Sequence, residues 1–152
     1  MLKKLIFVIL LGFSSASYAA YPNQEETLCL AQTLYHEARG ENRSGILAVA
    51  NLTINRTKSR QFPNSICGVV RQRNLNGCQY SWVCSGAQVK NNKKFAEMWQ
   101  ISDQILRGKI RMNILSHDVM WFHNKHVKPW WAKHGTFAGR IGSHLYYKNV
   151  KK

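Results

Sequence analysis

Acidic residues are scarce in this chain: 7 Asp and Glu stand against 22 Lys and Arg among 152 residues, a formal net charge of +15. Proline is rare too, with 3 residues, and the 10 glycines form no repeat, which excludes collagen-like and low-complexity chains. Hydrophobic residues make up 45%, a normal share for a globular protein, so the charge does not imply wholesale disorder. The length fits a single domain.

Motifs of several common protein classes are missing as well. The chain has no GxSxG, P-loop or HExxH sequence. His123 and His126 have no Asp or Glu close in sequence, so we expect neither a metal nor an organic cofactor. The basic residues are scattered, which predicts no nucleic-acid partner. Anionic cell-envelope polymers are the expected partners, and a solvated basic face is the alternative.

Long apolar runs are absent beyond the first residues. Residues 1–19 contain two lysines, an apolar run over 5–13 and small residues up to Ala19, the pattern of a cleaved signal peptide. The run is too short for a membrane anchor. We expect residues 20–152 to be exported, periplasmic or secreted, as one monomeric domain without a stable membrane anchor.

Export changes the interpretation of the four cysteines. In an oxidising compartment an even set favours two disulfides, and three pairings are possible. We favour a small loop, Cys78–Cys84, and a long closure, Cys29–Cys67. Zinc binding would need matched pairs of ligands at close spacing, and the cysteines do not form two such pairs.

Hydrophobic periodicity predicts an α+β fold, mostly helical with a small C-terminal β-hairpin. Residues 71–92 are polar, and we interpret them as a long loop with extended structure at 79–83. The remaining elements are helices at 26–39, 44–57, 63–70 and 94–107, a strand at 119–123, and hairpin strands at 136–140 and 143–148, with Ser44 as a candidate helix cap and Gly40 and Gly108 as helix stops.

Glu37 is the acidic residue with the most informative position. It lies about 100° from the centre of the apolar stripe of its helix, near the angles of Leu30 and Leu34. Apolar neighbours would raise the pKa of its carboxyl group, as a general acid near neutral pH requires. The alternative is a boundary glutamate paired with Arg39 or Arg43.

Aromatic residues form a second candidate cluster, in two segments that resemble loops. Tyr80 and Trp82 lie beside Gln79 and Ser81 in the cysteine-tethered loop, and Trp130 follows a proline. Aromatic groups with polar neighbours fit a sugar-binding groove, although they could equally plug the ends of the core.

These residues belong to an ordered series of motifs that resembles the cell wall hydrolase family named for the spore-cortex-lytic enzyme SleB. The series covers roughly residues 28–148. It comprises YHEARGE at 35–41, AVA at 48–50, NR at 55–56, FP at 62–63, CGVV at 67–70, QYSW at 79–82, FHN at 122–124, WW at 130–131 and IGSHLYY at 141–147. Tyr80 replaces the family's usual phenylalanine.

The resemblance implies a compact lysozyme-like fold that cuts peptidoglycan glycan strands, and it places Glu37 at the family's essential acid. A lytic transglycosylase reaction is expected, with 1,6-anhydro-N-acetylmuramic ends. A water-using muramidase with Glu41 or Asp118 as second carboxylate, a wall amidase and a non-catalytic envelope-binding module are the alternatives. The expected substrate-binding residues are Glu41, Gln79, Tyr80, Ser81, Trp82, His123, Asn124 and Trp130, with Tyr80, Trp82 and Trp130 stacking on sugars.

Overall fold

Two capped helices form the centre of the molecule. The computed structural model describes residues 23–75 and 77–150. Helix α1 (Gln24–Ala38) begins at Asn23, whose side chain accepts a hydrogen bond from the Glu25 amide, and it buries its stripe of small and apolar residues. Helix α2 (Arg43–Thr57) is buried along nearly its whole length. Its cap is Asn42, not Ser44 as expected, because the Asn42 carboxamide accepts from the Gly45 amide at 3.0 Å.

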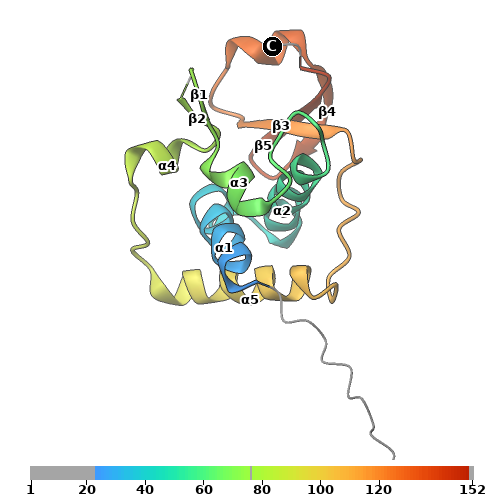
Figure 1. Cartoon of the computed structure of the whole chain (residues 1–152). Coiled ribbons are helices and arrows are strands. Elements are labelled where there is room, and N and C mark those ends of the chain that lie inside the picture. Colours follow the sequence, from blue (N-terminus) through green and yellow to red (C-terminus); the bar gives the residue numbers. More distant parts are fainter. Residues whose placement is uncertain (1–22, 76, 151–152) are drawn as a thin grey trace, which may run out of the picture.

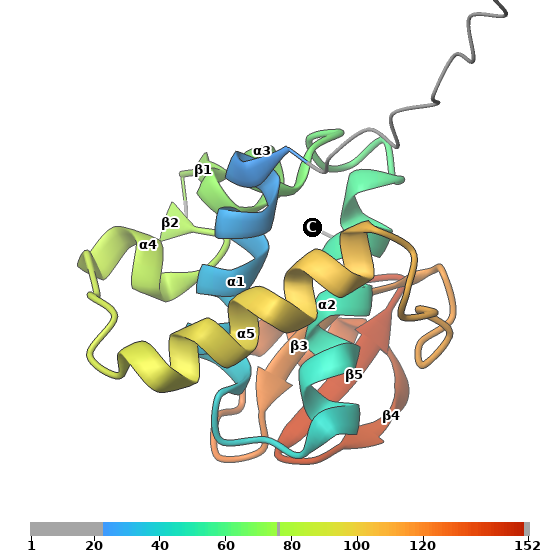
Figure 2. The same cartoon turned by 90° about the horizontal axis from the view of Figure 1, so that it is seen from below.

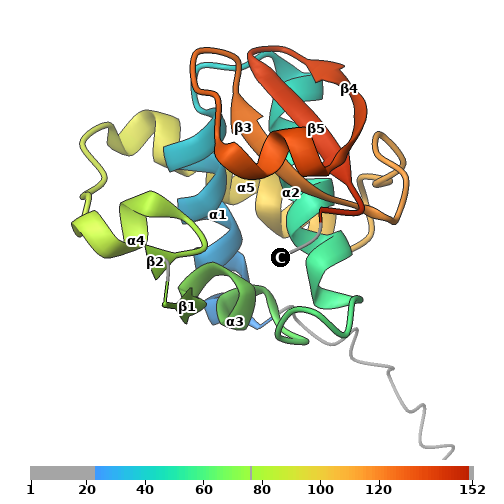
Figure 3. The same cartoon turned by 90° about the horizontal axis from the view of Figure 1, so that it is seen from above.

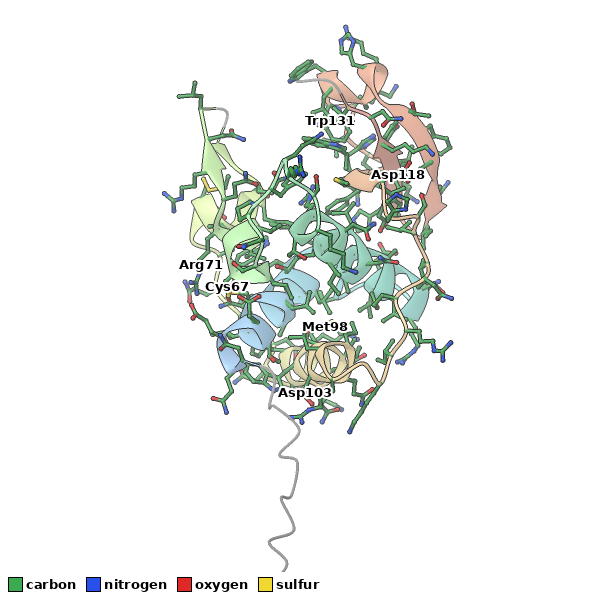
Figure 4. All side chains as sticks on the ribbon, turned by 45° about the vertical axis from the view of Figure 1, so that its right-hand side comes forward. Cys67, Arg71, Met98, Asp103, Asp118 and Trp131 are labelled. Atoms are coloured by element: carbon green, nitrogen blue, oxygen red, sulfur yellow. A yellow bond between two sulfur atoms is a disulfide. The ribbon has the colours of Figure 1, made fainter. Side chains whose placement is uncertain are left out.

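Two further helices pack around this pair. Helix α3 (Ile66–Arg71) begins three residues later than the expected start at 63, because the Ser65 side chain caps it by accepting from the Gly68 amide. Helix α5 (Asn92–Leu106) crosses α1 on one side of the molecule (Figures 1 and 2). Met98 points from α5 into the core while Asp103 lies on the outer face (Figure 4). The chain leaves α5 through Gly108 with a positive φ of 69°, as its position predicted.

The segment after α3 differs from its prediction. A short hairpin of β1 (Arg73–Asn74) and β2 (Gly77–Cys78) is followed by helix α4 (Ser81–Ser85), so the expected extended structure at 79–83 is wrong from Ser81 on. The Cys78–Cys84 disulfide gives the reason. Its Cα atoms are 5.7 Å apart, whereas six extended residues would separate them by about 20 Å. A turn of helix brings the two cysteines together.

The C-terminal part is a three-stranded antiparallel sheet. Strands β4 (Thr136–Ile141) and β5 (His144–Lys148) form the expected hairpin, and β3 (Val119–Asn124) pairs with β5, giving the order β3-β5-β4. The short 3₁₀ helix η1 (Trp130–His134) connects β3 to β4 (Figure 3). The α+β class and the mainly helical content are confirmed.

Buried polar side chains of α2 hold the sheet in place. Asn51 accepts from the Ile114 and Leu115 amides, and Asn55 donates to the Ser116 and Val119 carbonyls at 2.8 and 3.0 Å. These bonds satisfy backbone groups just before and at the start of β3 that would otherwise be buried unpaired. They fix β3 beside the helices, and β3 carries one wall of the site described next.

Both expected disulfides are present. Cys29–Cys67 joins α1 to α3, and Cys78–Cys84 joins β2 to α4. No helix among the described residues has the length and apolar character that crossing a membrane requires. The expected signal peptide, residues 1–19, lies outside the described residues.

Candidate active site

A cavity of about 780 Å³ lies beside the C-terminal end of α1. The β1–β2 hairpin and α4 form one wall, and β3 with η1 forms the other. Seven of the residues expected at a functional site line it: Glu37, Gln79, Tyr80, Ser81, His123, Asn124 and Trp130. The fold therefore brings together three segments that are far apart in the sequence.

Glu37 stands on the last full turn of α1, at the floor of this cavity. Burial raises the pKa of its carboxyl group to about 7, and nearby Arg56 opposes the rise. The end of a helix adds to the effect in principle, because its free carbonyls disfavour negative charge. Near neutral pH the group is thus divided between its acid and carboxylate forms, which suits a residue that gives and then takes a proton.

Arg56 is the buried cation of the site. Its side chain is 2% exposed, and its Nε donates to the Met120 carbonyl of β3 at 2.8 Å. Its guanidinium lies 5.3 Å from the ring centroids of both Phe62 and Tyr80. Burial lowers the pKa of Arg56, and Tyr80 and Glu37 counteract this. Since an arginine stays protonated in proteins, it supplies a fixed positive charge beside Glu37.

Gln79 and Tyr80 support this arginine from the cysteine-tethered segment. With its amide oxygen facing the guanidinium, Gln79 accepts from both terminal nitrogens of Arg56, at 3.0 and 3.2 Å. Tyr80 is 2% exposed and its hydroxyl is 2.8 Å from the Thr53 hydroxyl. The expected stacking of Tyr80 on a sugar is wrong, because so buried a ring has no free face. Its contacts hold Arg56 instead.

The opposite wall carries the exposed aromatic surface. Trp130 on η1 is 64% exposed at the rim, free to stack on a ligand. His123 is held on both sides, with its Nε2 3.2 Å from the Tyr147 hydroxyl and its Nδ1 2.9 Å from the Asn124 carbonyl. The Asn124 side chain accepts from the His126 amide. These two residues shape the wall of the cavity.

Two expected site residues lie elsewhere. The Glu41 carboxylate accepts from the amide and the hydroxyl of Ser143, so it ties the α1–α2 loop to the β4–β5 turn. Trp82 lines a second, smaller cavity, and its ring stacks on His36 with 4.6 Å between centroids. Neither residue lines the main cavity.

Glu37 is the one carboxylate lining this cavity among residues 23–75 and 77–150. Asp118, considered as a second carboxylate, lies 3.1 Å from the Lys148 amino group, and its pKa is lowered by its bond to Ser116 and by Lys148. The other acids also have partners. These are Glu25 with Arg71, Glu26 with the Ile66 and Cys67 amides, Glu97 with Lys94, and Asp103 with Arg107.

Sequence reasoning missed several residues of the site. Arg56 carried the clearest signal, since it lies on the buried face of α2, three residues after Thr53, where a charge needs a partner. His36 and His144 lie within the motifs given above, but no role was assigned to them, and tertiary packing brings them to the cavity. In the described part of the chain, no three His, Cys, Asp or Glu side chains meet as metal ligands would.

The fold has solved relatives. The catalytic domain of the Bacillus cereus SleB protein superposes with a TM-score of 0.61 over 86% of this chain and 94% of that one, at 22% identity. The catalytic domain of the germination-specific lytic transglycosylase SleB from Bacillus anthracis gives a TM-score of 0.61 over 83% and 96%, at 23% identity. The α+β arrangement described above is therefore the SleB catalytic-domain fold.

Sequence comparison then gives the family. The spore cortex-lytic enzyme of Bacillus subtilis (strain 168) is 51% identical over 41 residues, which are 27% of this chain and 13% of that enzyme. A sequence model of the Cell Wall Hydrolase family matches residues 40–147. The chain belongs to this cell wall hydrolase family. The matched region begins just after Glu37, so the role of Glu37 depends on the geometry of the site.

Proposed function

We propose that this protein cleaves the glycan strands of peptidoglycan as a lytic transglycosylase, with Glu37 as the acid and then the base. One observation carries the proposal: the main cavity has a single carboxylate among the described residues, and burial raises the pKa of that group to about 7. Membership of the cell wall hydrolase family and the fold shared with a lytic transglycosylase domain support it.

The reaction needs one carboxyl group. Protonated Glu37 gives its proton to the oxygen of the β-1,4 bond between N-acetylmuramic acid and N-acetylglucosamine, and the bond from that oxygen to the muramic C1 breaks. Positive charge develops on the muramic ring in an oxocarbenium-like state. The 6-hydroxyl oxygen of the same sugar attacks C1, and the Glu37 carboxylate takes the hydroxyl proton. The product is a 1,6-anhydro sugar, and no water is consumed.

A muramidase that uses water would normally need a second carboxylate across the scissile bond, as nucleophile or as base. Glu41 and Asp118 were the candidates, and both are committed to partners outside the cavity. Their placement favours attack by the internal hydroxyl. Arg56 beside Glu37 stabilises the carboxylate left after the first proton transfer, and this makes Glu37 a stronger acid than burial alone would allow.

Binding of the strand is assigned to the exposed parts of the walls. Trp130 offers a ring face to a sugar, and Ser81 and Gln79 line the cavity from the opposite wall. An exported enzyme fits this substrate, since two disulfides are suited to an oxidising compartment outside the cytoplasm.

The test is a digest of purified peptidoglycan, with the soluble products reduced by borohydride and analysed by mass spectrometry. Glu37→Gln is compared with Glu97→Gln, the same chemical change at an exposed position on α5 outside the cavity. We expect anhydro-muropeptides that resist reduction from the wild type and from Glu97→Gln. Loss of the general acid should slow Glu37→Gln by about 100-fold or more.

Each other product pattern points to a different activity. Reducible muramic ends would mean that water attacks, and Glu41→Gln and Asp118→Asn would then be examined. Free peptides released from uncut glycan would mean an amidase. Wall binding without any products, equal in wild type and Glu37→Gln, would mean a binding module. A Glu37→Gln protein that cuts normally would refute the role given to Glu37.

A further inference from the structure

A second cavity, of about 350 Å³, shares one lining residue with the first. It runs between α1, the end of α3, and α4 with the segment that follows it. Its walls include Gln32, His36, Val70, Arg71, Trp82 and Gln88. The segment after α4 is fastened to α1, because the Tyr35 hydroxyl accepts from the Lys90 and Asn91 amides at 3.0 and 2.9 Å. Hydrogen bonds of the fold thus hold the walls of this cavity together.

His36 joins the two cavities. Its side chain lines both of them, and it is the neighbour of Glu37 on α1. Trp82 stacks on its ring from the side of the second cavity, with the two planes 16° apart. The two cavities therefore share a wall residue that is the sequence neighbour of Glu37.

Arg71 is the one charged side chain among the described residues that line the second cavity, apart from the titratable His36. Arg71 lies on its wall, near the surface beside Cys67 (Figure 4). Its partner is Glu25, at 2.7 Å, and both side chains are more than half exposed. Exposed pairs of this kind are weak, so Arg71 can exchange Glu25 for a carboxylate of a ligand. Arg39 is close enough to His36 to reinforce the lowering of its pKa that burial begins. The cavity suits an acidic occupant.

We propose that the second cavity binds the acidic peptide that peptidoglycan carries on its muramic sugar, with Arg71 binding a peptide carboxylate. The inference rests on the proposed function, since it places that sugar over Glu37. It gives Trp82 a role different from the sugar stacking expected from the sequence: Trp82 forms the wall along which the peptide leaves the glycan.

The dimensions agree with this occupant. Gln32 and His36 are one helical turn apart on α1, about 6 Å along its axis, and the cavity continues to Arg71. Three extended residues of a peptide span about 10 Å. The volume lies near the lower end of the range for small-ligand sites, about 300 to 1,000 Å³.

The test compares three glycan substrates of matched length: strands with their peptides, strands with the peptide carboxyls amidated, and strands freed of peptide. We expect the wild type to cleave the first with a kcat/KM about five-fold higher than the other two, the effect of a partly exposed charge pair. Arg71→Gln should lose most of this preference. Arg60→Gln, an exposed arginine outside both cavities, should keep it.

A binding measurement keeps the peptide site distinguishable from the catalytic role. In the Glu37→Gln background, calorimetry with a peptide-bearing muropeptide should show weaker binding when Arg71→Gln is added. Equal kcat/KM on all three substrates, or a preference that Arg71→Gln retains, would overturn the peptide site while leaving the proposed function intact. Absence of anhydro products from every strand, with muropeptide binding that depends on Arg71, would refute only the proposed function.

Discussion

At the scale of single residues, the properties of Glu37 come from its surroundings. The carboxyl group is mostly buried, and the nearest cation, Arg56, is itself engaged with Gln79, Tyr80 and the Met120 carbonyl. Desolvation therefore outweighs the attraction of the cation, and the pKa moves upward. An arginine free to form a direct ion pair would have lowered the pKa of Glu37. The group would then be ionised near neutral pH and unable to donate a proton.

The raised pKa of Glu37 has a cost in stability. The folded protein holds this proton up to about pH 7, whereas the unfolded chain releases it near 4.5. The bound proton therefore contributes fully to the stability of the fold below about pH 4.5, and this contribution is lost as the pH rises toward 7. By linkage the loss is about 3 kcal/mol. Glu37→Gln has no carboxyl proton to lose, so its stability should not fall in this way. The free energy of unfolding of the variant relative to wild type should therefore increase from pH 5 to pH 8.

Urea unfolding at both pH values measures this difference. Glu97→Gln is the control, because its carboxylate is exposed and lies outside the cavity. A difference in free energy of unfolding between Glu37→Gln and wild type that stays constant with pH would contradict the raised pKa of Glu37.

At the scale of elements, two disulfides serve different purposes. Cys29–Cys67 closes a separation of 38 residues between α1 and α3, and neither cysteine lines the main cavity. Cys78–Cys84 closes a separation of 6, and the residues inside it include Gln79 and Tyr80, which hold Arg56. The first mainly restricts the unfolded chain, and the second also fixes a wall of the site.

Removing each disulfide should separate these effects. In the chain-entropy model, the double serine variant of Cys29–Cys67 should lose about 4 kcal/mol of stability and that of Cys78–Cys84 about 2 kcal/mol. Activity at a temperature where both variants are folded should fall more for the second, because Gln79 loses its fixed position. Thermal unfolding and the rate of glycan cleavage measure the two quantities. Activity lost equally in both variants would contradict the role given to the small loop.

The β4–β5 turn shows how closely elements meet around the site. A Cβ atom at Gly142, which has a positive φ of 59°, would collide with the Glu41 carboxylate. Glu41 also bonds to Ser143. The glycine is therefore required for close approach as well as for backbone conformation. Glu41 thereby holds the loop after α1 against the sheet, near the end of the helix that carries Glu37.

At the scale of the whole molecule, a net charge of +15 suits association with an anionic wall. Raising the salt from about 0.01 to 0.1 M shortens the Debye length from about 30 to 10 Å. We expect kcat/KM on intact peptidoglycan to fall over this range while kcat changes little, because long-range attraction acts on encounter with the substrate. Initial rates measured at several substrate concentrations separate the two constants. A salt-independent kcat/KM would mean that the charge is only a solvated face.

The sequence by itself determined the local parts. Apolar periodicity located α1, α2 and α5, the Ile141-Gly142 turn located the β4–β5 hairpin, and helix geometry placed Glu37 at the edge of an apolar face. These features depend on residues three or four positions apart in the sequence, or on a single turn, so the local sequence pattern is enough to predict them. The start of α2 was misplaced by one residue because Asn42 and Ser44 are both good caps.

Only the tertiary structure decided which side chains meet. It buried Tyr80, moved Trp82 to a second cavity, engaged Glu41 with Ser143 and placed Arg56 beside Glu37. It also turned residues 81–85 into a helix, since the disulfide partner of Cys78 had to return within 5.7 Å. Burial and pairing depend on segments that are distant in the chain. A local pattern can therefore supply the acid, whereas the packing of α1, α2 and the sheet sets its pKa and selects its neighbours.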